Sequence, residues 1–240
     1  MDSVFDVSKI KYKNNMKKIV ILIILLTPMF HFAQQNDSIK MKSFSIGGTY
    51  STDYCYRIIS AKESMKWLKN EMDTLEIPKI GFTTGINFDY TLSNRISISS
   101  GFLYSDKGEK LKEKVIPTIK KSIDHINYID IPLKLNYNIS TNKTKFYISA
   151  GISTNIFLSN KILIQKENSS SRDLIIGNSD FSKINFASIL NIGINQDITE
   201  NWYFKTELLY RQSINPITKS DLNRYLYSFG LNLGLYYRLK

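Results

Sequence analysis

The sequence has little of what several protein classes need. Its 240 residues include one cysteine, which excludes an intrachain disulfide framework and a cysteine-based zinc site. Two histidines leave little for histidine-dependent catalysis, and eleven glycines with five prolines are too few for a collagen-like or low-complexity chain. No apolar run approaches the roughly 18 residues that a helical membrane span needs. Hydrophobic residues make up 42% of the chain, which predicts one domain with a sizeable core.

The N-terminal segment has the pattern of an export signal. Lys17 and Lys18 precede a short apolar stretch, and the small residue Ala33 precedes a polar segment. This order is typical of a secretory signal peptide cleaved after Ala33, with an uncleaved anchor or a buried helix as the alternative. The predicted segments are an upstream extension or mis-called start, the signal peptide and a short periplasmic N-terminal segment (1–15, 16–33 and 34–42).

From residue 43 onward, apolar and polar residues alternate with a period of two. Around Leu208, for example, Trp202, Phe204 and Tyr210 share one face, while Glu207 lies on the other. Such alternation predicts β-strands, and none of the apolar faces carries a charge. Eight segments show the pattern (43–56, 80–90, 96–104, 129–139, 146–158, 184–198, 202–210 and 225–239). Short turns alternate with three long connections, which are 57–79, 106–127 and 159–183. This order predicts an up-and-down antiparallel meander.

The two faces favour a barrel in a membrane over a soluble one. A soluble barrel turns its apolar face inward and needs many charged residues outside, and a secreted barrel or sandwich of this kind is the alternative. Here the polar face is mainly small, with sparse and nearly balanced charges, which suits a narrow lumen. The uncharged apolar face suits lipid, where a charge at the midplane costs roughly 2–4 kcal/mol. Aromatic residues at both strand ends resemble interfacial girdles (Tyr54, Tyr104, Tyr137, Trp202, Tyr210 and Tyr237).

We therefore predict that 43–240 forms an all-β, eight-stranded antiparallel up-and-down transmembrane β-barrel. Two stretches add a family resemblance: 101–108 reads GFLYSDKG and 128–134 reads YIDIPLK. Together they resemble the PorT-like outer-membrane β-barrel family of Bacteroidota, within the broader OmpX/OmpA-like group, over about 43–240. The resemblance implies an outer-membrane location, with termini in the periplasm and insertion by the barrel-assembly machinery. Most proteins of this family have no assigned activity, but PorT itself is associated with type IX secretion, so the resemblance also implies secretion components as partners.

The charges on the polar face lead to a functional prediction. We expect five of them to form a salt-bridged network that plugs the lumen, with a conducting pore as the alternative (Asp130, Lys134, Lys205, Glu207 and Arg211). The predicted protein is non-enzymatic and structural, adhesive or accessory to secretion, with no cofactor, no metal and no nucleic-acid partner. A small outer-membrane enzyme or a carrier of an apolar ligand is the alternative.

The long connections hold further candidates. His125 beside Asp124 is a candidate for a hydrolase or acyltransferase site, but no partner motif accompanies it, so we expect a solvated loop pair. A capping-box pattern, SAKE at 60–63, precedes apolar residues at helical spacing and predicts a short amphipathic helix that covers the rim or docks a partner. Lysines of the second long connection are candidates for contact with outer-membrane lipid or lipopolysaccharide (Lys107, Lys110, Lys112, Lys114, Lys120 and Lys121).

Overall fold

The computed structural model describes residues 43–113, 119–140, 144–166, 172–175 and 180–239. The predicted extension, signal peptide and N-terminal segment (1–15, 16–33 and 34–42) lie outside these described residues.

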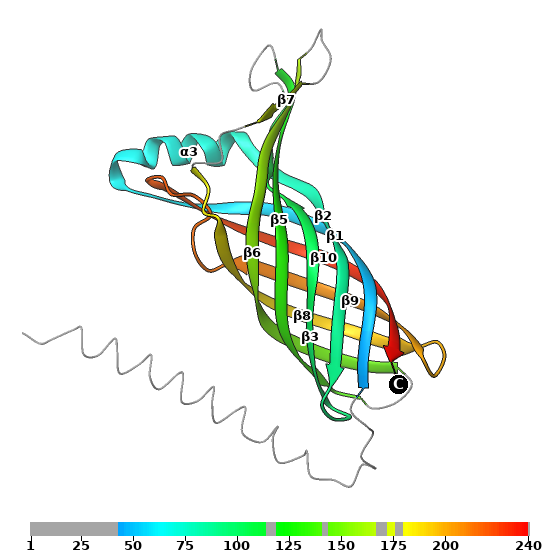
Figure 1. Ribbon diagram of the computed structural model, residues 1–240. Helices are drawn as coiled ribbons and strands as arrows, with labels where there is room; N and C mark the ends of the chain where they lie inside the picture. Colours follow the sequence, from blue (N-terminus) through cyan, green and yellow to red (C-terminus); the bar gives the residue numbers. More distant parts are fainter. Residues whose placement is uncertain (1–42, 114–118, 141–143, 167–171, 176–179, 240) are drawn as a thin grey trace, which may run out of the picture. The chain divides into compact units, whose positions relative to one another are not determined.

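Eight strands of the described chain close into a ring, in which each strand pairs antiparallel with the next (Figure 1). Closure comes from the first and last strands, whose pairing runs from Phe44 opposite Leu239 to Ala61 opposite Leu222. The strands are β1 (Ser43–Ala61), β2 (Glu76–Thr91), β3 (Ile96–Lys107), β5 (Ile119–Asn138), β6 (Thr144–Lys166), β8 (Ile184–Asp197), β9 (Trp202–Ser213) and β10 (Leu222–Leu239). This confirms the predicted all-β, eight-stranded antiparallel barrel.

The apolar face of the strands lies outside the ring. Leu133, Leu208 and Leu233 are 54%, 56% and 41% exposed, whereas the adjacent Lys134 and Glu207 are buried inside. Because successive strand residues point to opposite faces, the same alternation runs around the whole ring. The soluble-barrel alternative, which needs the apolar face inside, is therefore wrong.

The two ends of the barrel differ. At one end, here called the short-turn end, brief connections join the strands (92–95, 139–143 and 198–201). At the same end the first residues of β1 pair with the last residues of β10. The opposite end, the long-loop end, carries η2 (Glu63–Met65), α3 (Lys66–Leu75), β4 (Glu109–Leu111) and β7 (Arg172–Ile175) (Figure 1). None of the described helices has both the length and the apolar content to cross a membrane.

The predicted helix exists as α3, but its predicted cap is wrong. Ser60 still belongs to β1, and the helical segment begins with the turn η2, for which Lys62 provides no side-chain cap. The helix is instead tied to the barrel at its other end, where Arg57 donates a hydrogen bond of 2.9 Å to Asp73.

Several strands also run further toward the long-loop end than the sequence predicted. β1 continues to Ala61, β5 begins at Ile119 and β6 ends at Lys166, so much of each predicted long connection is strand. Between β3 and β4 the chain bends at Gly108, whose φ of +126° favours glycine. A Cβ there would also lie 2.3 Å from the carbonyl oxygen of Asp124.

An apolar cluster lies inside the barrel toward the long-loop end. It joins side chains from β5, from β10 and from the segments that precede β8 and β10 (Ile126, Tyr128, Phe181, Ile217 and Leu226). All five are buried, and the half-buried Phe157 of β6 stacks on Phe181 with ring centroids 4.9 Å apart. We call this cluster the apolar cap, because it lies between the polar lumen and the long-loop end.

Candidate functional site

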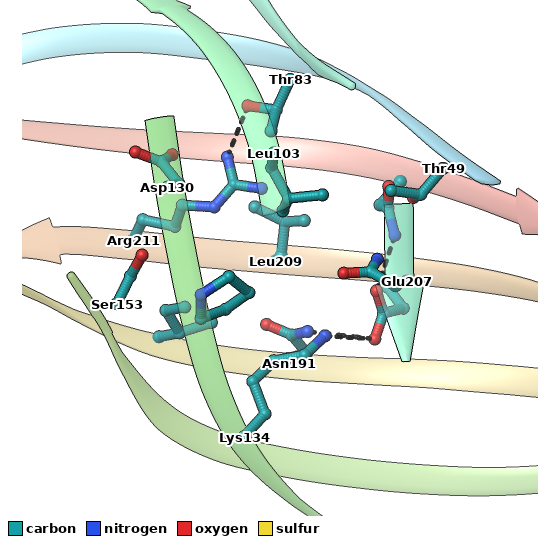
Figure 2. Close-up of a pocket in the computed structure, with 14 residues that line it drawn as sticks. Thr49, Thr83, Leu103, Asp130, Lys134, Ser153, Asn191, Glu207, Leu209 and Arg211 are labelled. Atoms are coloured by element: carbon teal, nitrogen blue, oxygen red, sulfur yellow. Dashed lines mark hydrogen bonds and ion pairs between the residues drawn. The ribbon is translucent and has the colours of Figure 1, made fainter. Parts of the chain in front are cut away.

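The centre of the lumen is organised around Glu207 of β9 (Figure 2). Its carboxylate accepts hydrogen bonds from Lys134 Nζ at 3.0 Å, Tyr147 at 2.7 Å, Asn191 at 3.1 Å and Asn232 at 2.7 Å. These donors come from β5, β6, β8 and β10, so one acidic side chain links strands on several sides of the ring. Burying a carboxylate away from water costs free energy unless the carboxylate is paired in this way.

A second ion pair lies nearer the short-turn end. Lys205 Nζ is 2.5 Å from an oxygen of Asp89, and the Tyr203 hydroxyl donates to the same carboxylate at 2.8 Å. The ammonium group also lies over the ring of Tyr236, 4.9 Å from its centroid. The lumen here is filled by aromatic rings as well as charges, because Tyr203 and Tyr236 stack with centroids 5.1 Å apart.

Two more pairs lie between Glu207 and the apolar cap. Arg211 donates to Asp53 at 3.0 Å, and Asp130 accepts from Lys107 at 3.0 Å. The five predicted lumen residues are therefore all buried, but only Lys134 and Glu207 pair with each other. Lys107, predicted to face lipopolysaccharide from a loop, is 6% exposed at the end of β3.

These side chains leave little open space. Two hollows among them measure about 20 and about 10 Å³, and a single water needs about 10–15 Å³. Charges of both signs cross the ring at successive levels, so the interior is a packed polar core.

The predicted girdle residues all lie on the outer face. Tyr54, Tyr104 and Trp202 are 48%, 37% and 42% exposed. Tyr137, Tyr210 and Tyr237 are half-buried against neighbours such as Trp202, whose ring lies 5.0 Å from that of Tyr237. Trp202 and Tyr210 are eight positions apart on β9, which is about 26 Å along a strand and about 20 Å at a tilt of ~40°.

His125 is not in a solvated loop, as the sequence predicted, but in β5. Its Nδ1 lies 2.9 Å from Asp106 Oδ2 and 3.2 Å from Lys79 Nζ, and Lys79 in turn donates to Asp106 at 2.7 Å. Among the described residues no hydrogen bond joins this imidazole to a serine, threonine or cysteine. The group is a buried ion pair of Lys79 and Asp106 that His125 contacts.

A larger cavity opens at the long-loop end. Its volume is about 390 Å³, and its lining includes Glu76, Glu109, Asp124 and Arg224. These groups lie beyond Tyr104, which pairs with Ile129 further down the barrel wall. We call it the end cavity.

Burial raises the pKa of Glu109 in the end cavity to about 7, and nearby Asp124 and Glu76 act in the same direction against Arg224 and Arg57. Burial likewise raises the pKa of Asp124 to about 6. Within the described part of the chain, no group of three or more histidine, cysteine, aspartate or glutamate residues is arranged to hold a metal ion.

Sequence reasoning missed several members of these sites. Asp53 and Asp89 were recognisable as inward-facing, but alternation does not give their height in the barrel. Glu109 and Arg224 lay in or beside segments read as loops. Their alternation continues past the aromatic residues, and that continuation was the available signal.

Comparison with solved structures finds similar folds at low identity. Neisserial surface protein A shares 13% identity over 83% of this chain and 100% of its own, with a TM-score of 0.49. AlkL, an outer membrane protein solved in DMPC bilayers, shares 13% over 86% and 94%, with a TM-score of 0.49. OprG from Pseudomonas aeruginosa shares 11% over 84% and 97%, with a TM-score of 0.46. No curated protein matches the chain.

A family model extends over most of the barrel. The model described as an outer membrane protein beta-barrel domain matches residues 32–219, which is more than half of the chain. The match agrees with a closed ring that is apolar outside and polar inside. The chain therefore belongs to the outer membrane protein beta-barrel domain family.

Proposed function

We propose that the protein is a non-enzymatic outer-membrane barrel whose lumen is plugged and whose partners bind at the long-loop end. The observation that carries the proposal is the pairing of lumen charges by partners from other strands, as in Lys134 with Glu207. A plugged eight-stranded barrel offers no path for solutes, so its role is structural, adhesive or accessory to secretion.

The proposed orientation places both termini and the short-turn end in the periplasm. Bacterial barrels have short periplasmic turns and longer extracellular loops, which supports this orientation. The predicted signal peptide at 16–33 supports export, and membership of the outer-membrane barrel family supports the proposed insertion by the barrel-assembly machinery. We place the protein in the PorT-like family of Bacteroidota on its sequence resemblance, with secretion components as proposed partners.

Lipopolysaccharide is a proposed contact of the long-loop end. Lys112 and Lys121, from the predicted basic stretch, are exposed there, as are Lys161 and Lys166 of β6. Their positive charges suit an anionic surface. The predicted Lys114 and the side chain of Lys120 lie outside the described residues, and Lys107 faces the lumen.

Planar-bilayer recording tests the plug. We expect purified protein to give no steady channel, while a porin inserted into the same bilayers gives stable steps. The boiled and unboiled protein should migrate differently on gels, which shows that the barrel is folded in the preparation. A reproducible, long-lived conductance from folded protein would refute a plugged lumen.

A further inference from the structure

The end cavity has the size and walls of a small-molecule site. Its volume of about 390 Å³ falls in the range of roughly 300–1,000 Å³ common for such sites. Leu111, Ile162, Phe181 and Leu222 contribute apolar side chains to the lining. Phe181 also belongs to the apolar cap, and Tyr128 and Leu226 of the same cap line the smaller lumen hollow, so the cap lies between the two spaces.

Negative charge is in excess around this cavity. Arg224 lies 2.9 Å from Glu109, 3.5 Å from Glu76 and 3.8 Å from Asp124. Behind it, Arg57 contacts Glu76 and Glu109 and also pairs with Asp73 on α3. Two guanidinium groups and Lys69, which pairs with Asp73, thus face four carboxylates. Asp180 and Lys110, which also line the cavity, do not change that balance.

Two buried acceptors in the same lining can still accept hydrogen bonds. Glu109 is 3% exposed and Asn160 is 1% exposed. The amide oxygen of Asn160 accepts no hydrogen bond, and the carboxylate of Glu109, although ion-paired with Arg224, accepts none in good geometry. Such acceptors are costly to leave unpaired, and the group that satisfies them must be a hydrogen-bond donor.

We propose that the end cavity binds a small organic cation, whose ammonium or amidinium group donates to Glu109 and Asn160 while its apolar body packs against Phe181 and Leu111. A cation supplies hydrogen-bond donors to the two acceptors and positive charge to the excess of carboxylates. Metal binding is not favoured, because the described chain holds no suitable cluster of ligands. This inference does not depend on the proposed plug, which lies on the other side of the apolar cap.

The site should respond to pH. Glu109 is faced by Arg57 from β1, Glu76 from β2, Asp124 from β5 and Arg224 from β10. Burial raises the pKa of Glu109 to about 7, so a proton competes with the ligand near neutral pH. Affinity for a permanently charged ligand should therefore fall as the pH drops from 8 to about 5.5.

Benzamidine and its uncharged analogue benzamide form a matched pair of probes. Each is titrated into folded, ¹⁵N-labelled full-length protein in detergent micelles, and the amide shifts of residues near 109, 160 and 181 are followed. We expect saturable shifts with benzamidine and at least about tenfold weaker binding of benzamide, because a charge-assisted hydrogen bond is lost. Equal binding of the two probes, or no shift in this region with either, would overturn the proposal.

Three variants locate the cation. Glu109→Gln should weaken benzamidine binding about tenfold, and Asn160→Ala by about threefold or more, whereas Glu71→Gln on the exposed face of α3 should have no effect. Asn160→Ala removes an oxygen that accepts no bond in the protein, so it remains informative if Glu109→Gln fails to fold. If the folded cavity variants bind benzamidine as tightly as the Glu71→Gln control, the site is wrongly placed.

Discussion

Glu207→Gln is the sharpest test of the packed polar lumen. The substitution keeps the shape of the side chain but removes the charge that pairs with Lys134, which is 8% exposed. It also places an amide where Tyr147, Asn191 and Asn232 all donate. Removing one partner of a buried ion pair costs about 3–5 kcal/mol, so we expect a loss of that order in the free energy of unfolding.

Urea unfolding of the detergent-solubilised barrel, followed by tryptophan fluorescence, measures this loss. Asp221→Asn is the matched control, because Asp221 pairs with Lys62 where both side chains are more than half exposed. Such surface pairs contribute about 0–1 kcal/mol. Combining Glu207→Gln with Lys134→Met should cost less than the sum of the single changes by about 0.5–3 kcal/mol. If Glu207→Gln costs no more than Asp221→Asn, the lumen pairs do not hold the barrel together.

Two further predictions concern the outer face and the bend at the long-loop end. Leu233→Arg, midway along the outer face of β10, should destabilise folding into lipid vesicles by about 2–4 kcal/mol, while Leu239→Arg at the strand end costs about 0–1 kcal/mol; equal costs would contradict a lipid-facing band. Gly108→Ala should lower stability by about 1–3 kcal/mol, because of its positive φ and the close Asp124 carbonyl. Gly48→Ala, where a Cβ meets nothing within 4 Å, serves as its control in thermal unfolding, and similar melting temperatures would show that the bend is not strained.

Side-chain direction was the part of the fold that the sequence predicted well. Leu208 and Glu207 are neighbours in the chain, yet one is 56% exposed and the other is 1% exposed. The reason is physical: a strand in a closed ring has only two sides, and a period of two assigns every residue to one of them. The number of strands and their antiparallel order followed from counting such segments and the turns between them.

Which charged side chains pair with each other inside the lumen could not be predicted in the same way. Asp53 and Arg211 are 158 positions apart in sequence, and they meet because β1 and β9 both pair with β10. Their contact depends on register, which sets how far up the ring each residue lies. Charges such as Lys79 and Asp124 were assigned to loops because the lipid-facing apolar ladder weakens there, although their strands continue.

The sizes of neighbouring side chains close the lumen, in addition to its ion pairs. Tyr147 occupies the interior beside Gly193 of the neighbouring strand, where a Cβ would lie 2.6 Å from the ring. A small residue on one strand thus makes room for a large polar residue on the next, and the interior of the barrel is filled. An interior packed in this way cannot admit a ligand without losing buried ion pairs. The end cavity requires no such loss, because it is already open and borders the apolar cap only through Phe181. Binding chemistry in this barrel is therefore expected at its long-loop end and not along its axis.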